Sequence, residues 1–279
     1  MKGSILYTKL QRPPVATDIV PRDRLLDQLN AGLHRPLTLI SAPAGYGKST
    51  LASRWVVACD RPSVWVSLDN DDNDLRQFLN YLLAGIKQRF PKSKLRSETF
   101  LDADRLPATK ELARCLLNDL SQVPDSFIIV FDDYQHITEI SVHDLVASLL
   151  EHPVQTMHLV LLTRQDPSLP IATMRGGGLV TEIRASNLRF TPDETAKFLS
   201  QMLNVTVDDA TAALLEVKTE GWAVGLRLAG LYLQGQKELK RSIQQLSGNS
   251  RHIAEYLLAE VVSKQHPEMV SYLLETSIL

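Results

Sequence analysis

The residues best suited to chemistry lie near the start of the chain, where two glycines, a lysine and two hydroxyl residues follow one another. Residues 41–50 read Ser-Ala-Pro-Ala-Gly-Tyr-Gly-Lys-Ser-Thr. Glycines let backbone N–H groups converge on phosphate oxygens, and the N-terminus of a following helix adds a positive dipole. Lys48 would then reach the β- and γ-phosphates, and the Ser49 hydroxyl would bind Mg²⁺. The segment predicts a nucleoside triphosphate site that uses Ala44, Gly45, Tyr46, Gly47, Lys48, Ser49 and Thr50.

This segment departs from the strict G-x-x-x-x-G-K-[ST] pattern at one position. Ala42 stands where the pattern has its first glycine. The alternative is a fortuitous glycine-rich turn before a helix. Residues 37–40 are typical of a buried strand and residues 51–58 of a helix, which is the context that a phosphate loop requires. We therefore favour the phosphate loop.

Two adjacent carboxylates end another apolar run. Residues 127–131 are Phe-Ile-Ile-Val-Phe, and Asp132 and Asp133 follow them. In P-loop NTPases an Asp at the end of such a strand holds Mg²⁺, and we assign this role to Asp132. Asp133 would orient and polarise the attacking water, as a general base does. The alternative is that both aspartates cap the next segment, since Asp is common there.

A hydroxyl and a guanidinium end a further buried run, residues 159–162. They are Thr163 and Arg164. If this strand lies between the 37–41 and 127–132 strands, its end faces the γ-phosphate. Arg164 would then distinguish triphosphate from diphosphate through charge-assisted hydrogen bonds. The alternative is a solvated arginine at the end of a strand.

The composition is that of an ordinary folded protein with little charge bias. Of 279 residues, 44% are hydrophobic and 22% charged, and 30 basic residues against 32 acidic ones give a net charge of −2. This balance argues against a dedicated nucleic-acid surface, although it leaves room for a local patch. No segment approaches the roughly 18 consecutive apolar residues of a membrane span, and no signal-peptide core follows the start. We expect a cytoplasmic protein with no membrane partner, in which Cys59 and Cys115 are reduced thiols.

Apolar runs alternate with helical patterns over the first part of the chain. Strands are expected at 37–41, 63–68, 127–132, 158–163 and 180–184. Helices are expected near 48–58, 73–90, 108–121 and 141–151, after an earlier helix that begins near Arg22. Continuous apolar strands separated by helices indicate a parallel sheet covered on both faces. The predicted fold class is α/β, a P-loop NTPase domain with a parallel five-stranded sheet, followed by an α-helical domain.

The strand signals stop after about residue 186. A Thr191 N-cap, Pro192 and Glu194 form a helix start. Further helices are expected near 192–203, 208–219, 222–236, 250–265 and 267–276. We therefore expect residues 1–186 to form the nucleotide-binding domain, with an extended lead-in over 1–22, and residues 187–279 to form a helical domain.

The order of several short motifs is similar to one family. The motifs are the decapeptide 41–50, Trp65-Val-Ser-Leu-Asp69, Phe131-Asp132-Asp133-Tyr134, Leu162-Thr163-Arg164, Asn187-Leu-Arg-Phe190-Thr191 and Glu220-Gly221-Trp222-Ala223. Together they resemble the N-terminal nucleotide-binding region of the MalT-like, LuxR-type ATP-dependent transcriptional regulators, which belong to the STAND class of signal-transduction ATPases. The resemblance covers essentially the whole chain, and in that family an alanine at position 42 is ordinary.

The resemblance implies further nucleotide contacts. Val20-Pro21-Arg22 matches the short motif whose backbone and arginine contact the adenine and the nucleotide, so Val20 and Arg22 join the expected site. Gly221 and Trp222 lie where these ATPases carry a Gly-x-Pro element that closes over the nucleotide. Ala223 replaces the proline here, which puts a direct proline contact to adenine in doubt.

The resemblance also implies a function. ADP would hold a closed resting form, inducer and ATP would open it and promote self-association, and slow ATP hydrolysis would reset it. DNA would be bound only through a C-terminal helix-turn-helix that follows a winged-helix segment and an inducer-binding array. Leu279 falls about where the winged-helix segment would begin, so we expect this chain to be the front part of a longer protein.

Other classes of P-loop protein remain alternatives. A small-molecule kinase should show an arginine-rich lid, whereas Arg175 and Arg184 are isolated in the sequence. An AAA-type motor would normally need an arginine finger from a ring neighbour. A nucleotide-binding scaffold that never hydrolyses is a third possibility, against which Asp133 argues mildly. Rapid turnover, phosphoryl transfer to a metabolite or stimulation by DNA would favour the enzyme or motor.

Overall fold

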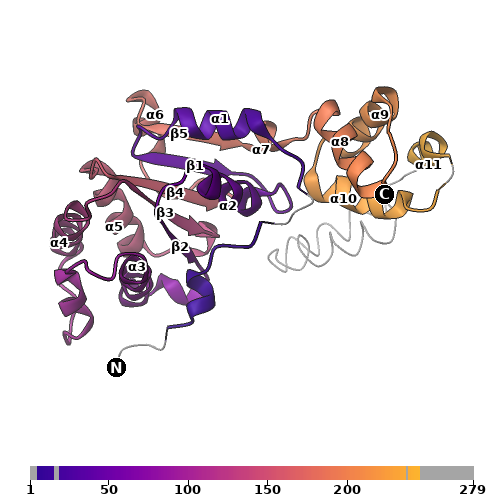
Figure 1. Cartoon of the computed structure of the whole chain (residues 1–279). Helices are drawn as coiled ribbons and strands as arrows, with labels where there is room; N and C mark the ends of the chain where they lie inside the picture. The colour runs from indigo at the N-terminus through magenta and orange to yellow at the C-terminus, as the bar shows by residue number, and fades with distance from the viewer. Residues whose placement is uncertain (1–4, 16–18, 237, 246–279) are drawn as a thin grey trace, which may run out of the picture. The chain divides into compact units, whose positions relative to one another are not determined.

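The centre of the first part of the chain is a sheet of five parallel strands (Figure 1). We describe the protein from a computed structural model, which describes residues 5–15, 19–236 and 238–245. The strand order is β2-β3-β4-β1-β5, and every neighbouring pair is parallel. The strands are β1 (Leu37–Ser41), β2 (Ser63–Ser67), β3 (Phe127–Asp132), β4 (Met157–Thr163) and β5 (Val180–Arg184). The predicted fold class is thus confirmed.

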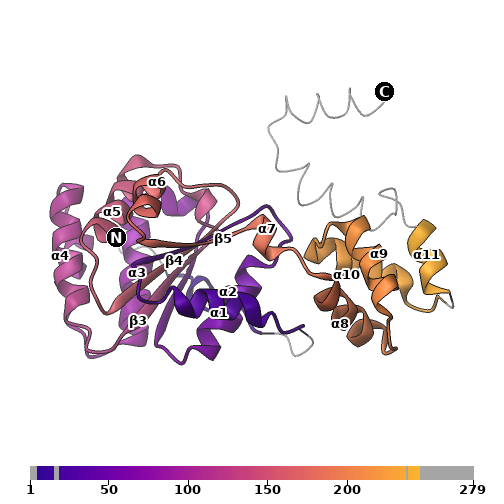
Figure 2. The same cartoon turned by 90° about the horizontal axis from the view of Figure 1, so that it is seen from above.

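The three central strands are buried along their whole length, because helices cover both faces of the sheet. Every residue of β1, β3 and β4 is buried, which explains their unbroken apolar sequences. Figure 2 shows α1 and α2 on one side of the sheet and α3, α4 and α5 on the other. The helices are α1 (Asp23–Ala31), α2 (Lys48–Ala58), α3 (Leu75–Arg89), α4 (Thr109–Ser121), α5 (Ile140–Glu151), α6 (Ile171–Gly176) and α7 (Ala185–Leu188).

Helices replace strands after Leu188. They are α8 (Pro192–Leu203), α9 (Asp209–Thr219), α10 (Ala223–Leu233) and α11 (Leu239–Gln245). The Thr191 side chain accepts from the Glu194 backbone N–H while the Glu194 side chain accepts from the Thr191 N–H, so α8 begins with the predicted capping box. Apolar residues of these helices, among them Leu199, Leu215 and Leu226, form their own core.

The chain divides into two compact units. The first contains Arg22–Pro43 and Lys48–Asn187, and the second contains Ala44–Gly47 together with the described residues from Leu188 onward. The tip of the expected phosphate loop therefore groups with the later helices. The division at residues 186 and 187 that the sequence indicates remains our proposal.

The structure differs from the expected elements mainly at their ends. The predicted 73–90 helix begins instead at Leu75, because Asp74 is its N-cap and accepts a hydrogen bond from the Gln77 N–H. Residues 70–73 form a separate 3-10 turn. The short helices α6 and α7, and α11, were not expected from the sequence. The helices expected at 250–265 and 267–276 lie outside the described residues. Among the described residues, none of the helices has the length and hydrophobicity needed to cross a bilayer.

A buried histidine joins β4 to β1 on one face of the sheet. His158 is 2% exposed. Its Nδ1 lies 2.7 Å from the Arg35 carbonyl oxygen and its Nε2 lies 2.9 Å from the Thr38 hydroxyl. A carbonyl can only accept, so Nδ1 carries the proton and Nε2 accepts from Thr38 in the neutral ring. Burial lowers the pKa of His158 to about 4, while the bond to Arg35 opposes this shift.

This histidine makes the stability of the protein depend on pH. Because the folded-state pKa is depressed, the unfolded chain binds the proton first, and stability that is full above pH 6.5 falls as the pH drops toward 4. We expect the wild type to lose about 2 kcal/mol more than His158→Gln between about pH 7.5 and about pH 5. Urea unfolding at both values measures this difference. Parallel losses in the two proteins would contradict the assignment.

Candidate phosphate-binding site

The predicted phosphate loop leaves β1 and enters α2 at the carboxyl edge of the sheet. The Ala42 N–H donates to the Thr163 carbonyl at 3.1 Å, which fixes the start of the loop against the end of β4. Lys48, the first residue of α2, is 7% exposed. Its Nζ donates to the carbonyl oxygens of Ala42 at 2.8 Å and Pro43 at 3.0 Å. The lysine side chain thus folds back over residues 41–43, the root of its own loop.

Two glycines give the loop a backbone that other residues rarely adopt. Gly45 has φ +79° and Gly47 has φ +77°. Residues with a Cβ are strained in this region, so these positions favour glycine. Such a backbone turns successive N–H groups toward one side, as an anion-binding loop requires.

Ser49 and Asp132 meet beside this loop. The Ser49 hydroxyl donates to Asp132 Oδ1 at 2.9 Å, and the Asp133 N–H donates to the same oxygen at 3.0 Å. The other carboxylate oxygen of Asp132, Oδ2, accepts no hydrogen bond from the described part of the chain. The sequence places these two residues 83 positions apart, and the parallel pairing of strands brings them together.

The charges at this edge influence one another. Burial and the neighbouring Asp133 carboxylate together raise the pKa of Asp132 to about 6, against the opposing effects of the Ser49 hydroxyl and Lys48. Burial also lowers the pKa of Lys48, and so does Arg164, whereas Asp133 and Asp132 raise it. Four of the residues that the sequence singled out therefore lie within electrostatic reach of one another.

The strand order satisfies the condition set for Arg164. β4 lies between β1 and β3, and Ser41 pairs with Thr163. The half-buried Arg164 therefore leaves the sheet between the phosphate loop and the two aspartates. Its role toward the γ-phosphate stays a prediction.

Gln135 is a residue of this site that no sequence pattern indicated. Its Nε2 donates to Asp133 Oδ1 at 2.8 Å, and its Oε1 accepts from the Arg164 backbone N–H at 3.1 Å. Asp133 itself has φ 57°, a left-handed conformation that Asp tolerates. Gln135 thus orients the Asp133 carboxylate and ties the end of β3 to the end of β4. A single Gln two residues after an Asp carries no sequence signal.

The remaining predicted residues fall in several places. Thr50 is exposed in the first turn of α2, and Tyr46 is half-buried. Arg22 is buried and is the N-cap residue of α1 in the first unit. Val20 is buried and belongs to the second unit, as does Gly221, which has φ +64°.

Trp222 contacts the tip of the loop within the second unit. Its indole Nε1 donates to the Ala44 carbonyl at 3.1 Å, and the Val224 N–H donates to the Gly45 carbonyl at 3.2 Å. A Cβ at Gly45 would lie 2.7 Å from the indole nitrogen. Glycine is therefore required at position 45 for close approach as well as for its backbone.

The two loop glycines allow a matched test of this contact. A Cβ at Gly47 would meet no atom within 4 Å, although its φ is almost the same as that of Gly45. Gly45→Ala should therefore displace the indole and change the emission of Trp222, whereas Gly47→Ala should not. Trp55 and Trp65 are 0% and 3% exposed and supply a constant background. Identical emission spectra for the two variants would contradict the contact between Gly45 and Trp222. The spectrum of Trp222→Phe shows which part of the emission comes from Trp222.

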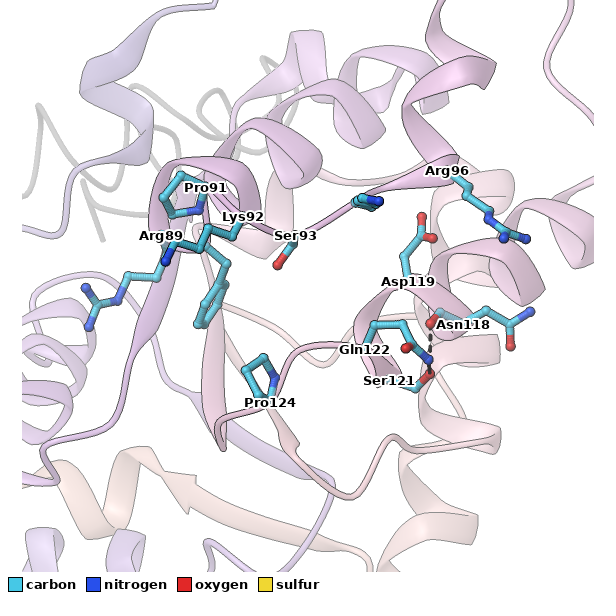
Figure 3. Close-up of a pocket in the computed structure, with 12 residues that line it drawn as sticks. Arg89, Pro91, Lys92, Ser93, Arg96, Asn118, Asp119, Ser121, Gln122 and Pro124 are labelled. Carbon is cyan, nitrogen blue, oxygen red and sulfur yellow. Dashed lines mark hydrogen bonds between the residues drawn. The ribbon is translucent and has the colours of Figure 1, made fainter.

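A separate hollow of about 980 Å³ lies away from this site (Figure 3). Phe90, in its wall, packs on Phe127, the first residue of β3, with ring centroids 5.4 Å apart. The hollow is therefore at the amino ends of the strands, opposite the phosphate loop. Its cations lie beside the C-terminal ends of α3 and α4, whose negative dipoles they complement. They are Arg89, Lys92, Lys94 and Arg96.

The sheet order and the loop define the class of protein. A parallel β2-β3-β4-β1-β5 sheet, with a phosphate loop after β1 and carboxylates after β3, is the P-loop NTPase fold. Solved structures support the fold. The Walker-type ATPase PABY2304 of Pyrococcus abyssi aligns with a TM-score of 0.55 at 18% identity, over 85% of this chain and 73% of that chain. A RuvB variant of Thermotoga maritima aligns with a TM-score of 0.52 at 13% identity, over 95% and 85%.

Sequence relatives identify the group within this class. The chain is 32% identical to the HTH-type transcriptional regulator MalT of Yersinia enterocolitica over 278 residues, 99% of this chain and 31% of MalT. It is 32% identical to the serine/threonine-protein kinase PknK of Mycobacterium tuberculosis over 271 residues, 96% of this chain and 24% of PknK. No protein-family model matches. The similarity confirms the resemblance to the P-loop region of MalT-like regulators, and the chain spans about a quarter to a third of these relatives.

Proposed function

We propose that this chain binds ATP and ADP and serves as the nucleotide switch of a transcriptional regulator. The observation that carries the proposal is the convergence of Lys48, Ser49 and Asp132 at the carboxyl edge of β1 and β3. Lys48 supplies a buried cation beside a loop whose backbone suits an anion. We propose adenine rather than guanine as the base, with nucleotide contacts of Val20 and Arg22, because the motifs of this chain resemble those of the MalT-like regulators.

The oxygen atoms at this edge suit Mg²⁺. Ser49 Oγ and the Asp132 carboxylate are hard oxygen ligands, held together at 2.9 Å, and a buried carboxylate whose pKa is raised gains from a neighbouring cation. When bound, the ion would neutralise charge on the phosphates. We propose Ser49 and Asp132 as the residues that hold it.

Asp133 and Arg164 are proposed for the hydrolytic step. Asp133 would accept a proton from the attacking water, with Gln135 holding its carboxylate in place. Arg164, at the end of the strand between the two motifs, would bind the γ-phosphate. Slow hydrolysis would return the protein to an ADP-bound resting state.

The second unit would report which nucleotide is bound. Trp222 holds the Ala44 carbonyl at the tip of the loop, so a change in loop conformation alters that contact directly. We propose that Gly221 and Trp222 sense the nucleotide in this way. ATP would favour self-association of the full-length regulator in the cytoplasm, with DNA bound by another part of that protein.

Nucleotide release and turnover test the switch. The purified chain is denatured, the released nucleotide is identified by chromatography, and ATP turnover is then measured. Stoichiometric ADP with turnover slower than about 1 per minute supports the switch, since intrinsic rates of regulatory P-loop proteins are of that order or lower. An empty site that turns over many ATP per second would instead favour the motor or small-molecule kinase.

A further inference from the structure

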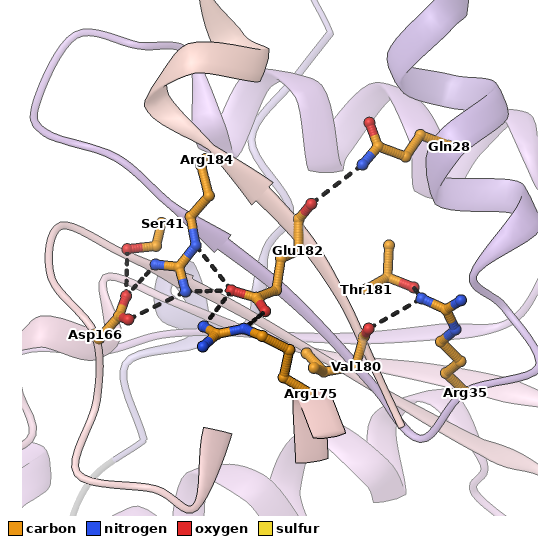
Figure 4. A network of polar contacts seen from close by, with 9 residues as sticks. All are labelled: Gln28, Arg35, Ser41, Asp166, Arg175, Val180, Thr181, Glu182 and Arg184. Atoms are coloured by element: carbon orange, nitrogen blue, oxygen red, sulfur yellow. Dashed lines mark hydrogen bonds and ion pairs between the residues drawn. The ribbon is translucent and has the colours of Figure 1, made fainter. Parts of the chain in front are cut away.

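Four charged side chains form a continuous network at the carboxyl ends of β1, β4 and β5 (Figure 4). Arg184, the last residue of β5, binds Asp166 through both terminal nitrogens, with NH2 to Oδ2 at 3.1 Å. Arg184 Nε also donates to Glu182 Oε2 at 2.9 Å. Arg175 donates to Glu182 at 2.5 and 3.0 Å. Two cations and two carboxylates thus balance each other.

One end of this network reaches the phosphate loop. The Ser41 hydroxyl donates to Asp166 Oδ1 at 3.0 Å. Ser41 is the last residue of β1 and is 7% exposed, and the loop begins at the next residue. The carbonyl of that residue, Ala42, accepts from Lys48 Nζ. Asp166 therefore contacts the residue directly before Ala42, whose carbonyl accepts from the phosphate-binding lysine.

The other contacts of Asp166 fix it in place. It follows Thr163, the end of β4, by three residues, and Ser41 pairs in register with both Thr163 and Arg184. The Asp166 carboxylate therefore joins the ends of β1 and β5, from a position shortly after the end of β4. The Arg184 guanidinium holds the pKa of the Asp166 carboxyl below its usual range, so this group is charged at neutral pH.

We propose that Asp166 is a positioning residue of the nucleotide site: it holds the Ser41 hydroxyl at the root of the phosphate loop and ties that root to the end of β5 through Arg184. The inference rests on the proposed nucleotide binding. Asp166 acts through Ser41 and not through contact with the nucleotide. Without its charge, residue 166 is a weaker acceptor for the Ser41 hydroxyl, and Arg184 keeps only Glu182 as an ion-pair partner.

The consequence is a loop that is less well organised before the nucleotide binds. In an ordered loop the backbone N–H groups are already aligned for phosphate. In a less ordered loop, nucleotide binding must also order the backbone, and this cost lowers the affinity for the nucleotide. Asp166→Asn keeps the shape of the side chain and removes the charge, so we expect about tenfold weaker ATP binding in the presence of Mg²⁺. Ser41→Ala should weaken binding in the same direction, and Ser41→Thr, which keeps a hydroxyl, should restore it.

A matched control lies at the far end of the same network. Arg175→Gln breaks the pair with Glu182, but Arg175 contacts neither Asp166 nor Ser41 through a hydrogen bond in the described structure. The ATP affinity of Arg175→Gln should stay within about twofold of the wild-type affinity. A twofold difference is about the size of the deviations found between independent sites. Thermal midpoints of all variants show how much stability each one loses.

The experiment is a titration of the whole chain with Mg²⁺-ATP for the wild type, the single variants and Ser41→Ala/Asp166→Asn. If Asp166 acts through Ser41, the double variant binds no more weakly than Asp166→Asn alone. The proposal would be overturned if Asp166→Asn bound ATP with wild-type affinity, or if Arg175→Gln weakened binding as much as Asp166→Asn does. Fully additive effects of Ser41→Ala and Asp166→Asn in the double variant would also overturn it. If the wild type itself binds no nucleotide, the proposed function fails instead. The Ser41→Ala and Ser41→Thr pair decides the question if Asp166→Asn does not fold.

Discussion

Replacing Lys48 with alanine is expected to raise the Kd for ATP by about 100-fold, because the phosphates lose about two charge-assisted hydrogen bonds from the lysine ammonium. The loop retains its glycines and the start of α2, but no other lysine or arginine lies in residues 41–50. Burial lowers the pKa of Lys48, so the charged form is disfavoured without a ligand. Loss of affinity should therefore occur without loss of folding stability.

Titration of Lys48→Ala with ATP and ADP measures this effect, and its thermal midpoint without nucleotide measures stability. Lys87→Ala is the matched control, because that lysine is exposed and pairs only with Glu98 among the described residues. The control should bind as the wild type does. Equal affinity in Lys48→Ala and the wild type would overturn the assignment of the phosphate loop.

Asp133→Asn is expected to bind ATP normally and to hydrolyse it about 100-fold more slowly, the usual contribution of a general base. Asn tolerates the left-handed backbone at this position, with φ 57°. Its amide oxygen can still accept the hydrogen bond from Gln135 Nε2. The substitution therefore removes the basic carboxylate and leaves the surroundings in place.

Single-turnover hydrolysis of bound ATP measures this step apart from ADP release. Asp132→Asn serves as the contrast, since it should weaken the Mg²⁺ dependence of binding. Retention of ATP in Asp133→Asn, with unaltered affinity, is the expected result. An unchanged rate of hydrolysis would show that Asp133 is not the base.

The strands and the long helices could be predicted because local sequence determines them. The boundaries of β1, β3 and β5 agree with the strands predicted at 37–41, 127–132 and 180–184. Helix α6 has 6 residues and α7 has 4, too few to show a helical period. Helix α10 ends at Leu233, three residues before the predicted end at residue 236.

The motif residues of the site could also be identified in advance, but their supporting contacts could not. Lys48, Ser49 and Asp132 belong to patterns with a fixed spacing. Gln135 meets the Arg164 backbone from 29 positions away, and Asp166 meets Ser41 from 125. Such pairs arise from the strand order, which a single sequence does not reveal. Arg175 and Arg184 look isolated in the sequence, and both are ion-paired in the folded chain.

Equilibrium titration of the wild-type chain with ATP, ADP and GTP, with and without Mg²⁺, decides whether this chain is a nucleotide-binding protein. We expect one adenine nucleotide per chain, bound with a Kd of about 1 μM or below, weaker GTP binding, and loss of ATP binding in Lys48→Ala. If none of these nucleoside di- and triphosphates bound, the result would contradict the proposed nucleotide site, because the loop, Lys48 and Asp132 would then bind no nucleotide.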